Sequence, residues 1–277
     1  MKHQKIANRM IFYFFLIILL FFVLFPFLQM LSTALKGPTE QFATPVHFIP
    51  KHFTLINFKQ AMAHKEFLRY FLNSLGVSIV TTCLAVFIGL LAAYGFTRTR
   101  FPGRKLLLNV VLFSQMFCLS AIAVPIYRIL AGLHLINTFY GLILSYLTFT
   151  VPVAVWLMRS FLLNIPLELE EAAITEGASK LGAFWKVVVP LMRPAIGAVG
   201  AYVFFQAWQE YLFALIIMTN NELRTLPIGI MDFVGQYGTN WGNLMAASII
   251  LAVPVFILFM FVQRELIAGL TEGAVKG

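Results

Sequence analysis

The chain has 277 residues, of which 60% are hydrophobic and 11% charged, with a mean hydropathy of +0.87 and a formal net charge of +9. A soluble domain of this length has too little interior to hide so much apolar surface, so the composition excludes an ordinary soluble protein and favours a membrane protein. We attribute the positive charge to cations at membrane edges and expect no nucleic-acid partner.

The apolar residues fall into six runs, each long enough to cross a hydrocarbon core of roughly 30 Å as a helix. They cover about residues 10–28, 75–96, 106–126, 139–163, 195–218 and 244–262. The first run is too long for the core of a signal peptide and lacks a clear small-residue cleavage site, so we interpret it as an uncleaved span. The prediction is an all-α, multi-pass membrane protein with six transmembrane helices.

Basic residues indicate the orientation of these spans. The amino-terminal tail, the second connector and an insert at residues 164–194 are basic, through Lys2, Lys5, Arg9, Arg98, Arg100, Arg104, Lys105, Lys180, Lys186 and Arg193. The third and fifth connectors carry only Arg128 and Arg224, so the positive-inside rule places both termini in the cytoplasm. The first connector disagrees, since it carries five Lys and Arg residues and must be external if the span count is even. We give more weight to the consistent asymmetry of the other connectors.

The insert at residues 164–194 has the pattern of two short helices. It opens with three glutamates, which complement the positive end of a helix dipole: Glu168, Glu170 and Glu171. Gly177 can take the left-handed conformation that ends a helix. Ser179 can cap a second helix over residues 180–189, which we expect Pro190 to stop. The sequence therefore predicts a helix, a glycine hinge and a helix outside the bilayer.

This insert resembles the EAA loop of permease subunits of ATP-binding-cassette importers, through Glu171-Ala172-Ala173, Gly177, Val187, Val189 and Pro190. Glu176 stands where that family usually has Asp. The resemblance implies a type I ABC importer permease fold, in which a short coupling helix lies parallel to the membrane and seats in a cleft of the cytoplasmic ATPase. The coupling residues that it implies are Glu171, Ala172, Ala173, Gly177, Phe184 and Pro190.

Further segments are similar to the carbohydrate-uptake branch of that family, specifically to the maltose-type second permease. They are residues 53–62, Asn73-Ser74, residues 92–107, Trp208-Gln209-Glu210-Tyr211 and the ending at residues 263–277. The resemblance implies that the C-terminal tail reaches the interface between two ATPases, through Gly273, Ala274, Val275, Lys276 and Gly277. It also implies that the connector at residues 219–243 contacts an extracellular binding protein.

We therefore expect one permease domain over residues 1–277, with a core at about 71–262, the EAA loop at 164–194 and a cytoplasmic tail at 263–277. The expected partners are a second permease of the MalF type, two ATPase subunits, a solute-binding protein and a sugar. The location is the cell membrane of a prokaryote. The sequence does not reveal which sugar is carried.

The transport pathway is expected where a polar side chain is too costly to expose to lipid. Glu210 lies in the fifth apolar run, and an intramembrane carboxylate normally faces a partner or a wet cavity. Aromatic rings beside hydrogen-bonding groups suit sugars, so the candidate pathway residues are Gln115, Gln206, Trp208, Gln209 and Glu210. The alternative is that Glu210 snorkels or pairs structurally and that Trp208 belongs to an interfacial belt.

The chain lacks a phosphate-binding G-x-x-x-x-G-K-[ST] motif, so it requires a partner ATPase to bind ATP and Mg²⁺. Its five histidines show no metal-ligand spacing, and we expect neither a cofactor, a metal nor enzymatic activity. Two alternatives remain: an ion-coupled secondary transporter that uses Glu210, and a membrane anchor of a redox enzyme.

Overall fold

The computed structural model describes residues 2–45, 47–64, 66–235 and 238–274, and within these ranges it describes the side chains of residues 9–263. Its contacts divide the chain into two compact units. Unit 1 comprises Met1–Leu68 and Gly229–Val253, and unit 2 comprises Arg69–Ile228 and Pro254–Gly277. Unit 2 contains the 164–194 insert and all of the predicted pathway residues.

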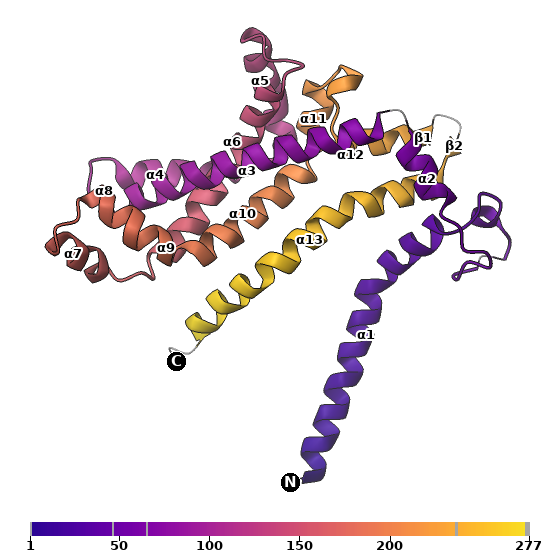
Figure 1. Ribbon diagram of the computed structural model, residues 1–277, viewed down its shortest axis with the longest axis horizontal. Coiled ribbons are helices and arrows are strands. Elements are labelled where there is room, and N and C mark those ends of the chain that lie inside the picture. Colours follow the sequence, from indigo (N-terminus) through magenta and orange to yellow (C-terminus); the bar gives the residue numbers. More distant parts are fainter. Residues whose placement is uncertain (1, 46, 65, 236–237, 275–277) are drawn as a thin grey trace. The chain divides into compact units, whose positions relative to one another are not determined.

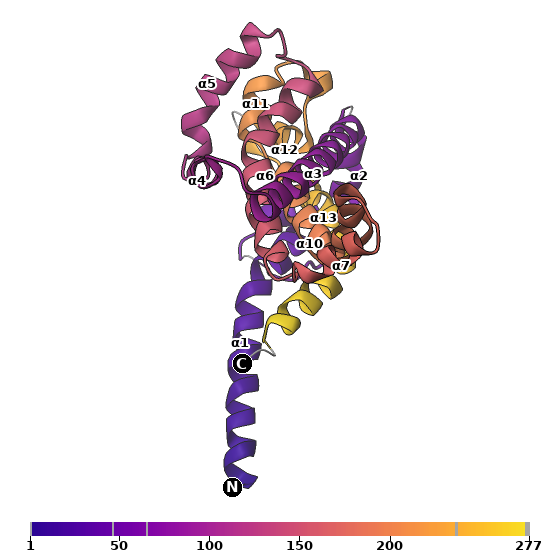
Figure 2. The ribbon, with the colours of Figure 1, turned by 90° about the vertical axis from the view of Figure 1, so that its left-hand side faces the viewer.

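Four helices are long and apolar enough to cross a membrane. They are α1 (Lys2–Ala34), α3 (Phe67–Arg98), α6 (Phe139–Leu162) and α13 (Trp241–Ala274). Two further candidates are bent pairs. In the first, α4 (Arg104–Ser114) and α5 (Leu119–Gly132) meet at 105°, a bend that is plain in Figure 2. In the second, Lys180–Leu191 meets α10 (Arg193–Trp208) at 72°.

The described residues thus hold four candidate spans, or up to six if each bent pair crosses the membrane once. The expectation of continuous helices over the third and fifth apolar runs was wrong. The third run breaks between Ser114 and Leu119, and the fifth breaks after Trp208, with α11 (Leu212–Ile217) following it. Hydropathy reports composition alone. At the second break the Glu210 carboxylate accepts from the N–H of Phe213, a backbone donor that a continuous helix would use itself. At the first break Gln115 donates to the carbonyl of Phe149 in α6.

Unit 2 has a core made of two groups of buried apolar side chains. One joins α3, α6 and α10 with the insert, through Ala85, Ala93, Ala154, Met158, Phe184, Met192 and Val199 among others. The other joins α5, α6 and α11, through Leu130, Leu142, Tyr146, Phe213 and Ile217 among others. Helices α3 and α6 approach closely, since a Cβ added to Gly89 would lie 2.7 Å from the Cβ of Ala154. Small residues permit such approach between membrane helices.

Unit 1 contains the first connector and a small hairpin. The connector holds η1 (Glu40–Phe42) and α2 (Ile56–Ala63), and the hairpin pairs β1 (Val234–Gly235) with β2 (Gly238–Thr239) after α12 (Leu226–Ile230) and η4 (Met231–Phe233). Asn57 organises the connector: its buried amide donates to the carbonyls of Ala34 at 2.8 Å and Lys36 at 2.7 Å. The N–H of Lys51 donates to Glu40 Oε1 at 2.6 Å, and chiefly for this reason the pKa of the Glu40 carboxyl is lowered.

Candidate functional site

The first half of the insert forms the helix, hinge and cap that the sequence predicts. After α7 (Glu168–Thr175), Gly177 has φ +97°, a conformation that other residues rarely adopt. The N–H of Ala178 donates to the carbonyl of Ala173 at 3.0 Å, which closes α7 as a Schellman motif does. Ser179 Oγ then accepts from the N–H of Gly182 at 3.0 Å. The predictions that Gly177 takes the left-handed conformation and that Ser179 caps the following helix are confirmed.

The second half of the insert differs from the prediction. Helical structure continues past Pro190, through α8 (Lys180–Ala183), a π-helical turn η2 (Phe184–Val188) and α9 (Val189–Leu191). Pro190 lies in the first turn of α9, where the N–H that it lacks needs no partner. The helix thus ends at Leu191, two residues beyond the predicted end at residue 189, and a bend of 72° separates it from α10. The expected stop therefore lies close to Pro190, whereas the π-helical turn before the proline was not predicted.

The insert exposes apolar side chains that a polar connector would not need to expose. Six large ones are between 41% and 66% exposed: Leu167, Leu169, Ile174, Leu181, Trp185 and Leu191. Of the predicted coupling residues, Glu171 and Ala172 are exposed. Phe184 is only 2% exposed, because its ring packs edge-on against Tyr94 at a centroid distance of 4.7 Å. Exposed apolar groups beside a carboxylate suit a protein partner. Phe184, by contrast, fixes the insert to α3 through Tyr94.

A buried ion pair fixes α7 to the end of α3. Glu170 is 2% exposed, and its Oε1 accepts from Arg98 Nε at 2.6 Å while its Oε2 accepts from the Tyr94 hydroxyl at 3.1 Å. Arg98 also donates through Nη2 to the carbonyl of Ile165 at 2.7 Å. From the sequence we predicted the same role for Glu170 and Glu171, as negative charges in the first turn of a helix. Neighbouring residues in a helix point about 100° apart, so the only indication in the sequence is that Glu170 and Glu171 face different directions around the helix axis.

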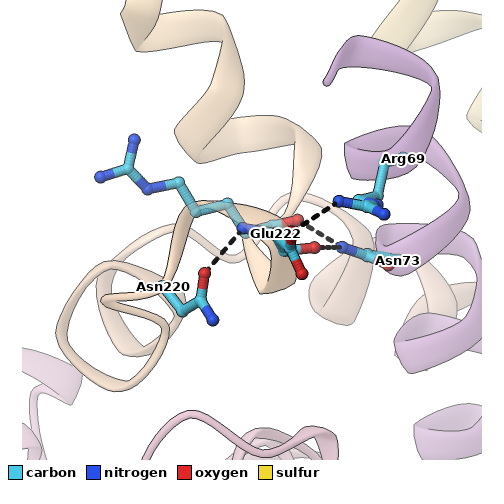
Figure 3. A network of polar contacts seen from close by, with 5 residues as sticks. Arg69, Asn73, Asn220 and Glu222 are labelled. Atoms are coloured by element: carbon cyan, nitrogen blue, oxygen red, sulfur yellow. Dashed lines mark hydrogen bonds and ion pairs between the residues drawn. The ribbon is translucent and has the colours of Figure 1, made fainter. Parts of the chain in front are cut away.

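At its other end, α3 is bonded to the connector that follows α11. Asn73 Nδ2 donates to the carbonyl of Glu222 at 3.0 Å and to that of Arg224 at 2.9 Å, and Arg69 Nη1 lies 3.5 Å from Glu222 Oε1 (Figure 3). At the next residue, Ser74 Oγ accepts from the N–H of Leu226 at 2.7 Å, and Ser74 is buried. The Asn73-Ser74 pair, which the sequence singled out by resemblance alone, therefore has a structural role.

The same connector is tied to the turn before α6. Asn137, which has φ +57°, accepts from the N–H of Asn220 through Oδ1 at 2.9 Å, and its own N–H donates to the carbonyl of Ile217 at 3.1 Å. Its side-chain amide donates to Thr219 Oγ1 at 2.8 Å. Asn220 in turn accepts from the N–H of Glu222 and caps η3 (Asn221–Leu223), as Figure 3 shows. The segment from 218 to 226 is thus held from two sides.

Glu210 acts as a helix cap in unit 2. The residue is 7% exposed. Its carboxylate accepts from the N–H groups of Phe213 at 2.8 Å and Ala214 at 3.1 Å. Trp208 is 1% exposed and packs on the rings of Phe71 and Phe204. These contacts explain why a carboxylate and an indole are tolerated in an apolar run, since both are buried and bonded or packed.

Of the remaining pathway candidates, Gln115 and Gln209 are exposed and Gln206 is half-buried. Gln209 Nε2 donates to Gln206 Oε1 at 3.1 Å, and Gln206 Nε2 donates to the hydroxyl of Tyr202 at 3.2 Å, so three polar groups follow one another along the end of α10. Gln115 lies in the break between α4 and α5 and donates to the carbonyl of Phe149 at 3.3 Å. Among the predicted pathway residues, the structure thus joins Gln206 to Gln209 and gives Gln115 a separate place.

The predicted tail lies only partly within the described chain. Helix α13 continues through Gly273 and Ala274, whereas Val275, Lys276 and Gly277 lie outside the described residues. Within the described residues no group of three or more His, Cys, Asp or Glu side chains is arranged to hold a metal ion.

The several apolar helices and the exposed helix–hinge–helix insert define a multi-pass membrane transport subunit. The chain belongs to the family described as binding-protein-dependent transport system inner membrane component, whose sequence pattern matches residues 85–271. It is thus a permease subunit of the carbohydrate-uptake group and not an enzyme.

Two curated relatives and one solved structure illustrate this membership. The sulfoquinovosyl glycerol transport system permease protein SmoH of Agrobacterium fabrum is 37% identical over 92% of this chain and 89% of its own length. The trehalose/maltose transport system permease protein MalG of Thermococcus litoralis is 31% identical over 99% of both chains. A crystal structure of a bacterial ABC transporter that imports alginate contains a chain with a TM-score of 0.77, at 20% identity, over 94% of this chain and 97% of that one. The last match shows a shared fold.

Proposed function

We propose that this chain is one of two permease subunits of an ATP-driven importer that receives a carbohydrate from an extracellular binding protein. The curated relatives are named for trehalose, maltose and sulfoquinovosyl glycerol, which are all glycosides, and this supports a sugar as the cargo. The coupling role is supported chiefly by α7. There the exposed carboxylate of Glu171 and exposed apolar side chains lie next to Glu170, which is buried and paired with Arg98.

The chain supplies mechanical coupling and half of the pathway. Two ATPase subunits bind ATP and Mg²⁺, and closure of their dimer pushes on α7 through Glu171, Ala172 and the exposed apolar side chains. Because Glu170 is bonded to Arg98, a displacement of α7 also displaces the end of α3. The two permeases then rock against each other and expose the pathway to the outside, where the binding protein delivers the sugar.

Six spans, with both termini and the 164–194 insert in the cytoplasm, complete the proposal. The C-terminal tail then faces the ATPases, and the first connector lies outside. The cations of that connector oppose the positive-inside rule, but at least one has a structural use: Lys36 is 4% exposed, and its ammonium donates to the carbonyl of His47.

The polar run Tyr202–Gln206–Gln209 is the part of α10 best suited to line the pathway. These side chains, of which Tyr202 and Gln209 are exposed and Gln206 is half-buried, offer donors and acceptors that match sugar hydroxyls. Both oxygens of Glu210 are engaged by backbone N–H groups, so the carboxylate shapes the end of the span instead of serving as an ion site. This geometry gives no support to an ion-coupled secondary transporter.

Transport in proteoliposomes tests the proposal. The complete assembly, with its partner permease, ATPases and binding protein, is reconstituted and supplied with labelled trehalose, maltose and other glycosides. We expect uptake of at least one to require both ATP and the binding protein. Uptake that is driven by an ion gradient without ATP would show that the proposed function is wrong.

A charge-reversal pair tests the docking face. Glu171→Lys should abolish uptake while the complex stays assembled, since the side chain is exposed and outside the predicted spans. Glu176→Lys is the matched control, because it reverses the same charge on the same short segment about 140° further around the helix. Equal effects of the two substitutions would contradict a specific role for Glu171.

A further inference from the structure

The turn that joins α3 to α4 is held together by local contacts (Figure 1). Arg104 Nη1 donates to the carbonyl of Thr99 at 3.0 Å across the turn. The ring of Phe101 lies against that of Phe96 in α3, with a centroid distance of 6.2 Å. Gly103 has φ +82°, a conformation that other residues rarely adopt, and α4 begins directly after it. The turn therefore has a defined shape at the end of α3.

A cavity of about 370 Å³ lies at this turn. Its lining residues are Arg100, Phe101, Gly103, Arg104, Lys105 and Leu106. Three of them are cations, and the sequence has no acidic residue between Glu66 and Glu168. No carboxylate nearby along the chain therefore balances these charges. The volume is within the range of small-ligand sites, and the charges favour an anion as the ligand.

The three cations differ from Arg98, which lies at the end of α3 and pairs with Glu170 at 2.6 Å. In the part of the chain that the structure describes, no Asp or Glu side chain pairs with Arg100, Arg104 or Lys105. The N-cap of α4 is a glycine and provides no side-chain cap, so the positive end of this helix dipole lies beside the same cavity. The side chains and the helix end thus present positive charge together.

Helix α4 continues from the cavity with exposed apolar side chains. Leu106, Val110 and Phe113 are between 57% and 68% exposed, and their spacing of four and three residues places them on one face of the helix. Together with α5, this helix is a candidate span, and in the proposed topology such a face meets acyl chains. The cavity therefore combines a cationic end with an apolar face that leads away from it.

We propose that this cavity binds the phosphate of an anionic membrane lipid whose acyl chains lie along α4. The inference rests on the proposed function for the side of the membrane, which makes the turn cytoplasmic. Arginine can donate two parallel N–H groups to a phosphate, and lysine attracts it as a point charge. Basic pockets on the cytoplasmic side of membrane helices suit such headgroups. A free phosphate has the same charge but would leave the apolar face without a contact, and this difference favours the lipid.

Mass spectrometry of the intact assembly tests the site. The complete transporter is stripped of lipid in detergent and titrated with dioleoylphosphatidylglycerol, and the tightest-bound lipid is followed. Arg100→Gln with Lys105→Gln removes two charges and keeps the bond from Arg104 to Thr99. One cation near an anionic lipid is worth about a factor of five, so we expect the affinity for this lipid to fall about 25-fold. Arg100→Lys with Lys105→Arg keeps both charges and should retain most of the affinity.

Lys5→Gln with Arg9→Gln is the matched control, because it removes two cations that the proposed topology places on the same side of the membrane. We expect it to leave the affinity unchanged. An equal loss in this control would show a general attraction to the membrane surface and would overturn the site. Dioleoylphosphatidylcholine and inorganic phosphate are the comparison probes. Binding of phosphatidylcholine as tightly as phosphatidylglycerol, or displacement of the lipid by inorganic phosphate, would also overturn the proposal.

A partner protein is the other class of ligand that these charges could attract. Loss of the ATPase subunits from the Arg100→Gln and Lys105→Gln assembly, with unchanged lipid affinity, would assign the cavity to the ATPase and overturn the lipid site. The proposed function fails in a different way, through the absence of ATP-dependent uptake by the wild-type assembly. Lipid affinity is measured without transport, so it would still decide whether the cavity binds the lipid.

Discussion

Replacement of Glu170 by glutamine removes the negative charge that faces Arg98 while keeping the size of the side chain. Both partners are buried, with side-chain exposures of 3% for Glu170 and 11% for Arg98. Loss of one partner from a buried ion pair costs about 3–5 kcal/mol, because the other charge stays buried without compensation. Glutamine retains an oxygen that accepts from Arg98 Nε, so we expect the lower end of that range. At 1.4 kcal/mol per factor of ten, docking of α7 on α3 weakens about 100-fold.

Amide hydrogen exchange on the assembled transporter measures this docking. In the Glu170→Gln variant, exchange of residues 168–175 should accelerate strongly, and uptake per ATP hydrolysed should fall. Tyr94→Phe removes only the bond at 3.1 Å and should cost about 1 kcal/mol, so its effect is smaller.

A double substitution separates charge from shape. Arg98→Gln combined with Glu170→Gln leaves no unpaired charge, and we expect it to be milder than Glu170→Gln alone, because removal of both partners of a buried pair is often nearly neutral. Wild-type exchange and uptake in the single variant would refute the reasoning. A double variant as damaging as the two single changes added together would refute it as well.

Three further predictions concern the hinge, the cap and the topology. Gly177→Val should impair coupling, because valine in a left-handed backbone conformation costs about 1–2 kcal/mol, whereas Gly177→Asn should be milder. The measurements are thermal unfolding and uptake of the two variants. Equal behaviour of the two would contradict a conformational role of Gly177. Glu210→Leu should lower the thermal stability of the complex by removing the cap of α11. Glu210→Gln should lower it less and retain transport, because its single amide oxygen can still accept from one of the two N–H groups. Loss of transport in an assembled glutamine variant would instead assign the charge to the pathway. Single cysteines at Ser179 and Asn240 should react with an impermeant thiol reagent from the cytoplasmic and the external side respectively, and labelling of both from one side would show that the span count is wrong.

The amino-acid sequence determined those features that depend on local interactions. Composition placed the chain in a membrane, and the helix-ending Gly177 and the helix-capping Ser179 act through backbone groups only a few residues away. The EAA pattern is equally local, so the family and the permease function followed from it, and the family match confirms both. Hydropathy also located the apolar runs, although it did not show that two of them are broken.

The tertiary structure decided the roles of individual charges. Glu170 and Glu171 are neighbours with the same chemistry, yet one pairs with Arg98, 72 residues earlier, and the other is exposed. Glu210 suggested a polar pathway by its position in an apolar run, but its oxygens cap the short helix that follows. Asn73 bonds a carbonyl 151 residues later. In each case the partner is fixed by how the helices pack, and no local pattern encodes a contact that only exists once distant segments meet.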